Sequence, residues 1–245
     1  MKIYQVDAFN NQIFKGNPAA VIPLNRWIDD FLMQQIAEEN NLSETVFFVE
    51  TKNYFEIRWF TPTCEVDLCG HATLAASHII FSELNYTKDL ITFQSKSGEL
   101  TVFKNNEWYT LNFPSEEIQE ISIPKNLEEG LNAKVLKCFK GKSELIAIFD
   151  NEEEISNLKP NYNTLLSLDF DGIIVTSKGN NVDFVSRFFA PKIGINEDPV
   201  TGSAHTFLIP YWSKKFDKVK LEAKQISKRE GILKFTYLND RVEII

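Results

Sequence analysis

The sequence is poor in cysteine, with three in 245 residues. A small, odd number of cysteines does not fit a disulfide framework, so we expect a reducing, cytoplasmic location. Cys64, Cys69 and His71 lie near one another, but their C-x4-C-x-H spacing does not match that of a structural zinc site. We therefore expect no metal there.

The sequence also lacks a basic excess and long apolar runs. Its 26 Lys and Arg residues are outnumbered by 34 Asp and Glu residues, which gives a net charge of −8. A protein of this charge without a basic run is a poor partner for nucleic acid or an anionic membrane. No stretch reaches the length of a membrane span, and the N-terminus lacks the apolar core of a signal peptide. We expect neither nucleic acid nor membrane as a partner.

Short runs of β-branched and aromatic residues, which are typical of strands, make up most of the chain. Three longer segments predict helices, at 29–41, 70–84 and 202–216. The last two are apolar around most of their circumference, which is typical of helices enclosed by strands. The polar stretch 114–126 interrupts the strand pattern and predicts a boundary between two halves, 1–114 and 115–245.

The two halves carry related patterns. Arg58-Trp59-Phe60-Thr61-Pro62 is similar to Arg187-Phe188-Phe189-Ala190-Pro191, and each run ends a predicted strand. Cys69 and Asp198 each stand eleven residues after the arginine, and a glycine that opens an apolar helix follows each of them. We interpret the pattern as an internal duplication in which Cys69 and Asp198 hold equivalent places.

A duplication predicts that the helix N-termini at Gly70 and Gly202 face a shared cleft. The first turn of a helix has unpaired N–H groups and a partial positive charge, which together suit an anion. We therefore expect the ligand to be a small anionic metabolite, a carboxylate or an amino acid.

These residues also resemble the PhzF-like family, phenazine biosynthesis protein PhzF and its relatives, which shares its fold with diaminopimelate epimerase. The likeness extends over positions 6–212 of the chain. Its motifs are VDAF (6–9), GNPAAV (16–21), NLSETVF (41–47), RWFTP (58–62), CGHATLA (69–75), SKSGEL (95–100), SRFFAP (186–191), EDPVTGSAH (197–205) and PYW (210–212).

The resemblance implies an α+β fold of two pseudo-symmetric domains, each a β-barrel-like strand layer around a central helix. The last strand of the chain is able to pack back on the first half. The resemblance further implies an active site between the domains, no cofactor, and a homodimer. The activity that it implies is a cofactor-independent isomerase or epimerase that transfers a proton on carbon.

The resemblance also assigns roles to individual residues. Glu44 matches the family's general acid/base, and Asp198 and His71 match its other catalytic positions. The positions expected to bind substrate are Gly70, Gly202, Ser203, Cys69 and Ser43.

Two alternatives remain open at this stage. Cys69 precedes a helix N-terminus, which lowers the pKa of a thiol, so a thiol-assisted amino-acid epimerase is one of them. Asp198 stands in place of a second thiol, which argues against a symmetric two-thiol enzyme. The other alternative is a catalytically silent ligand-binding protein with the same fold.

Overall fold

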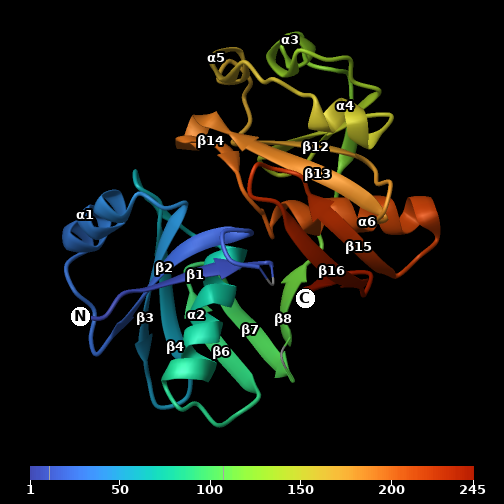
Figure 1. Ribbon diagram of the computed structural model, residues 1–245. Coiled ribbons are helices and arrows are strands. Elements are labelled where there is room, and N and C mark those ends of the chain that lie inside the picture. Colours follow the sequence, from blue (N-terminus) through green and yellow to red (C-terminus); the bar gives the residue numbers. More distant parts are fainter. Residues whose placement is uncertain (11, 107) are drawn as a thin grey trace. The chain divides into compact units, whose positions relative to one another are not determined.

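The computed structural model describes residues 1–10, 12–106 and 108–245, and the chain forms two compact units (Figure 1). Unit 1 consists of Met1–Phe113 together with Glu243–Ile245, and unit 2 of Pro114–Val242. Each unit contains many strands and few helices, which confirms the predicted α+β class.

The strands of unit 1 form one continuous series of pairings. β1 pairs antiparallel with β2, β2 parallel with β3, and β3 antiparallel with β4. β4 pairs antiparallel with β5 and parallel with β6, and β7 and β8 follow as antiparallel neighbours. These strands are β1 (Tyr4–Ala8), β2 (Asn17–Leu24), β3 (Glu44–Glu50), β4 (Phe55–Phe60), β5 (Glu65–Val66), β6 (Leu90–Ser95), β7 (Gly98–Asn105) and β8 (Trp108–Pro114).

Two helices accompany these strands, and both were predicted. In α1 (Asp30–Asn40), the Asp29 side chain accepts a hydrogen bond from the Phe31 N–H, which is the usual way to cap a helix start. Helix α2 (Gly70–Glu83) is buried along most of its length and packs against β1, β2 and β3. Because β3 contacts both helices, its residues from Thr45 to Val49 are all buried, and the four from Val46 onward are apolar.

Unit 2 repeats the order and direction of these pairings. β10 pairs antiparallel with β11, β11 parallel with β12, and β12 antiparallel with β13. β13 pairs antiparallel with β14 and parallel with β15, and β15 antiparallel with β16. The strands are β9 (Gln119–Ile121), β10 (Lys137–Lys140), β11 (Glu144–Ile148), β12 (Gly172–Lys178), β13 (Phe184–Ala190), β14 (Ile195–Asp198), β15 (Lys220–Gln225) and β16 (Gly231–Tyr237). The last strand, β17 (Arg241–Ile244), begins in unit 2, and its residues from Glu243 onward belong to unit 1.

Matching ion pairs join β4 to β5 in unit 1 and β13 to β14 in unit 2. Arg58 donates through Nε and Nη2 to both oxygens of Glu65, at 2.7 and 2.9 Å. Arg187 donates in the same way to Glu197, at 2.7 and 3.0 Å. Identical pairing order and identical two-pronged bonds support the predicted duplication.

The predicted equivalence of Cys69 and Asp198 is wrong. Seven residues separate Arg58 from Glu65, whereas ten separate Arg187 from Glu197, because the 3₁₀ turn η1 (Pro191–Ile193) enlarges the second connection. Val66 pairs with Trp59 and Asp198 pairs with Phe188, so Asp198 stands opposite Val66 in the repeat. The counterpart of Cys69 is then Thr201, which like Cys69 precedes a Gly-x-Ala helix start.

Helix α6 (Ala204–Phe216) is the third predicted helix and contains Pro210. A proline cannot donate to the carbonyl four residues earlier, which here belongs to Thr206. That carbonyl instead accepts a hydrogen bond from the Glu116 N–H at 3.1 Å, so the helix continues through the proline without a stranded acceptor.

Other parts of unit 2 were not predicted. The polar stretch 114–126 is more than a linker, since it contains β9, which pairs antiparallel with β10. The short helices α3 (Leu127–Leu131), α4 (Glu152–Ser156) and α5 (Tyr162–Leu165) are too brief to show an apolar period. Within the described residues, no helix is both long enough and apolar enough to span a membrane.

Candidate active site

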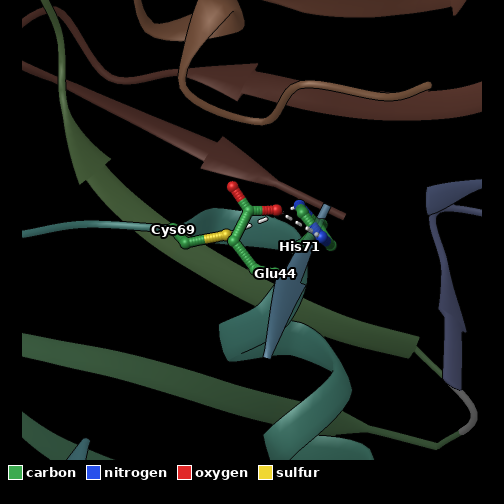
Figure 2. Close-up of side chains that lie close together, drawn as sticks. All are labelled: Glu44, Cys69 and His71. Carbon is green, nitrogen blue, oxygen red and sulfur yellow. Dashed lines mark hydrogen bonds and ion pairs between the residues drawn. The ribbon is translucent and has the colours of Figure 1, made fainter. Parts of the chain in front are cut away.

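Three side chains named from the sequence meet at the start of α2 in unit 1 (Figure 2). Glu44 is the first residue of β3, Cys69 immediately precedes α2, and His71 lies in the first turn of that helix. The Glu44 Oε2 and His71 Nε2 atoms are 3.2 Å apart, and the Cys69 Sγ and His71 Nδ1 atoms are 3.5 Å apart. The Glu44 and His71 side chains are only 12% and 4% exposed.

Asn17, which sequence analysis did not single out, orients the imidazole of His71. It is the first residue of β2, is fully buried, and has its Nδ2 atom 3.2 Å from His71 Nδ1. The Nε2 atom of the same ring faces the Glu44 carboxylate. Asn17 belongs to the GNPAAV motif, which was the available signal for it.

The backbone at the start of α2 is fixed by side chains of the same helix. The Thr73 hydroxyl donates to the Cys69 carbonyl oxygen at 2.5 Å, and the Thr73 N–H donates to the same atom at 3.2 Å. Gly70 and Cys69 are both buried. Ser43, on the bend before β3, is half-buried.

His71 is a neutral imidazole at physiological pH. Burial lowers its pKa from 6.5 to about 3. A neutral ring adds no positive charge beside the Glu44 carboxylate. That carboxylate therefore remains able to accept a proton.

In unit 2, Asp198 is held by a buried polar network that sequence analysis did not anticipate. The Thr201 hydroxyl donates to Asp198 Oδ2, and the Gln225 side chain donates to the Asp198 carbonyl oxygen at 2.8 Å. Gln225 also accepts from the Thr201 N–H at 2.8 Å. Asp198, Thr201 and Gln225 are 6%, 7% and 0% exposed, so the whole network is buried.

His205 fixes Thr201 from the next turn of α6. Its Nδ1 atom is 2.8 Å from the Thr201 carbonyl oxygen, the same relation that Thr73 has to Cys69 in unit 1. Burial lowers the pKa of His205 from 6.5 to about 4, so it too is neutral. Gly202 is buried and Ser203 is exposed at the helix start, where no side-chain hydrogen bond caps α6.

Because His71 and His205 are buried as neutral rings, we expect the protein to lose stability in mild acid. Between about pH 4 and 6.5 the folded rings stay neutral, whereas the unfolded chain takes up protons. The free energy of unfolding should therefore fall as pH drops through this window, by up to about 1.4 kcal/mol per pH unit for each histidine. Urea denaturation of the wild type and of His205→Gln at pH 7, 6, 5 and 4 measures the change of the unfolding free energy with pH. This change should be smaller in His205→Gln by the contribution of that histidine.

His78 provides the control for this pH dependence. It lies near Tyr109 on the exposed side of α2, with its Nδ1 atom 3.1 Å from the tyrosine hydroxyl. Partial burial also lowers the pKa of His78, so His78→Asn should reduce the slope, but by less than His205→Gln. Equal slopes in the wild type and His205→Gln would show that burial of His205 does not resist protonation.

The repeat does not duplicate the chemistry. Ala19 pairs with Glu44 in unit 1, and Glu144 pairs with Gly172 at the matching place in unit 2. Gly172 thus stands where unit 1 has its carboxylate, and Ser203 stands where unit 1 has His71. The carboxylate–imidazole pair belongs to unit 1, and the Asp198 network belongs to unit 2.

Unit 2 also contains a cavity of about 1320 Å³ away from these residues. Its walls include Tyr211, Trp212 and Lys215, with the Lys215 ammonium 4.9 Å from the centre of the Trp212 ring. None of the site residues named from the sequence lines it. The chemistry described above therefore does not depend on this cavity.

Comparison with known proteins gives a consistent result. The family model described as phenazine biosynthesis-like protein matches residues 6–244. A curated protein of Halalkalibacterium halodurans, named an uncharacterized isomerase, is 48% identical over 99% of this chain and 93% of its own length. The crystal structure of a PhzF-family phenazine biosynthesis protein from Enterococcus faecalis is 45% identical, with a TM-score of 0.95 over 99% of this chain and 93% of that one.

A more distant structure resembles the chain in fold. It is that of a predicted epimerase from Pseudomonas aeruginosa, which is 17% identical with a TM-score of 0.76 and covers 99% of this chain and 94% of that one. At this identity the likeness concerns the fold alone. It agrees with the epimerase-like fold class that the sequence predicts.

Proposed function

The chain belongs to the PhzF-like family of phenazine biosynthesis-like proteins, and on this premise we propose that it is a cofactor-independent isomerase. The proposed reaction is acid/base proton transfer on a carbon atom of a small carboxylate or amino-acid-like substrate. Relatives named as isomerases, 48% and 43% identical over almost the whole chain, support the reaction class. A cytoplasmic location and a homodimeric state are parts of the same proposal.

The observation that carries the proposal is the buried contact between Glu44 and His71. A carboxylate that removes a proton from carbon must be held in a fixed position and must keep a free lone pair. A neutral imidazole 3.2 Å away lies beside this carboxylate and adds no competing charge. Glu44 is therefore the proposed base, which takes the proton from one carbon and returns it to another. Inversion of one centre would need a second group to deliver the proton on the opposite face.

The remaining roles follow from the repeat and from the family resemblance. We assign the N–H groups at Gly70 and Gly202, together with Ser203 and Ser43, to the substrate carboxylate and the charge that develops on it. Asp198, fixed by Thr201 and Gln225, is assigned to a substrate amine or hydroxyl, or to the second proton transfer.

One observation favours a second candidate, a thiol-assisted epimerase. The Cys69 Sγ atom lies 3.5 Å from His71 Nδ1, so a thiol and a carboxylate flank the same imidazole. In this alternative, Cys69 exchanges the proton on one face of the substrate carbon, and Glu44 on the other.

Proton NMR in D2O tests the proposal without assuming the substrate. The protein is incubated with a panel of saturated and unsaturated amino acids and hydroxy acids, and each C–H signal is followed. An isomerase of this kind should remove one signal selectively from at least one compound. Saturable binding without exchange throughout the panel would instead favour a catalytically silent ligand-binding protein.

A further inference from the structure

Three different metal-binding groups converge in unit 1. Glu44, Cys69 and His71 each offer one ligand atom, and these atoms lie within 4.8 Å of one another (Figure 2). Cys64, the other cysteine near in sequence, is exposed and does not belong to this set. The cluster thus differs from the Cys64–Cys69–His71 set that the sequence spacing argued against.

The distances in this cluster suit a tetrahedral ion. Zinc bonds of about 2.0–2.1 Å to nitrogen and oxygen place two such ligand atoms about 3.3 Å apart in a tetrahedron. Glu44 Oε2 and His71 Nε2 are 3.2 Å apart, so they already stand at this separation. To complete a three-ligand set, the Cys69 thiol must turn from His71 Nδ1, where it lies at 3.5 Å, toward Nε2.

The chemistry of the donors selects the metal. A thiolate, an imidazole and one carboxylate form a mixed sulfur, nitrogen and oxygen set, which zinc accepts readily. Magnesium and calcium require several oxygen ligands, which the cluster does not offer. Three protein ligands also leave a fourth position for water or a substrate carboxylate.

We propose that Glu44, Cys69 and His71 form an inhibitory binding site for a thiophilic divalent cation, with Zn²⁺ as the preferred ion. Binding forms a bond from the cation to the Cys69 sulfur and releases the thiol proton to solvent. The cation also occupies an oxygen of the carboxylate that is proposed to accept the substrate proton, so the loaded protein cannot carry out that step. The inhibition rests on the proposed function, whereas the binding does not.

Cobalt titration measures the binding separately from any activity. Co²⁺ alone is added to the wild type, and the near-ultraviolet thiolate-to-cobalt absorption is followed. We expect one Co²⁺ per chain, displaced by an equivalent of Zn²⁺. In Cys69→Ser the thiolate absorption should disappear and the affinity should fall at least tenfold, because loss of outer-shell partners alone typically costs about 10–100-fold.

Cys64→Ser is the matched control, since it removes an exposed thiol outside the cluster and should leave the titration unchanged. If Cys69→Ser does not fold, Glu44→Gln provides the second test: it should keep the thiolate absorption and weaken the affinity at least tenfold. No thiolate absorption in the wild type, or absorption lost in Cys64→Ser and kept in Cys69→Ser, would overturn the site.

The proton-exchange assay then separates the two proposals. If cobalt binds as expected but no compound exchanges, the metal site stands and the isomerase proposal fails. If exchange occurs and micromolar Zn²⁺ inhibits the wild type but not Cys69→Ser, both stand. Exchange that is unaffected by Zn²⁺ at concentrations that saturate the cobalt site would refute the inhibitory role.

Discussion

Glu44→Gln should abolish exchange of the substrate C–H with solvent, with a rate loss of about 10³-fold or more. Glutamine preserves the size of the side chain and its contact with His71, whose Nε2 atom lies 3.2 Å from the carboxylate in the wild type. It cannot accept a proton. Binding of the substrate should therefore remain within about tenfold of the wild type, or about 1.4 kcal/mol. NMR exchange and calorimetric binding measure the two effects on the same protein.

Glu50→Gln is the matched control for this substitution. Glu50 is the last residue of β3, is exposed, and lies at the opposite end of the strand from Glu44. Its replacement should change neither exchange nor binding. If Cys69→Ala, correctly folded and still binding, loses exchange as completely as Glu44→Gln, then Glu44 is not the sole base and the thiol-assisted epimerase takes its place.

Much of the fold was visible in the sequence because its signals are local. The apolar circumference of 70–84 predicted a buried helix, and α2 spans Gly70–Glu83 with its core-facing residues on nearly every side. The matching runs at Arg58 and Arg187 predicted a duplication, and the strand pairings repeat in the same order in both units. Such features depend on periodicity and on residue type, which one chain carries in full.

The details of the site depended on contacts between distant residues. The sequence names Asp198, but Gln225, 27 residues later, supplies the amide that holds its backbone. Asn17 is 54 residues from the imidazole it orients. Counting along the chain also misplaced Asp198 in the repeat, because the turn at Pro191–Ile193 lengthens one connection. Insertions in loops preserve the strand pairings but shift every count made across them.

The two equivalent arginines should differ sharply in their contribution to stability. Arg187→Met should lower the free energy of unfolding of unit 2 by about 3–5 kcal/mol, the usual cost of removing one partner of a buried ion pair. Besides its bonds to Glu197, Arg187 donates to the carbonyl oxygens of Ile155 and Leu158, at 3.0 and 3.2 Å. Methionine keeps the apolar stem but leaves Glu197 and both carbonyl groups without this donor.

Arg58→Met is the internal control because it removes the same two-pronged bond from unit 1. Its other partner, Asp30, is 75% exposed, and Glu65 keeps an ion pair with Lys96 at 2.5 Å. Water and Lys96 can replace what the arginine supplied, so the expected loss is about 1 kcal/mol. Urea denaturation measures the loss of unfolding free energy in both variants, and the hydrogen exchange of backbone amides shows in which unit the loss occurs. Equal losses, or a larger loss for Arg58→Met, would show that the bonds from Arg187 to the two backbone carbonyl groups do not set the difference.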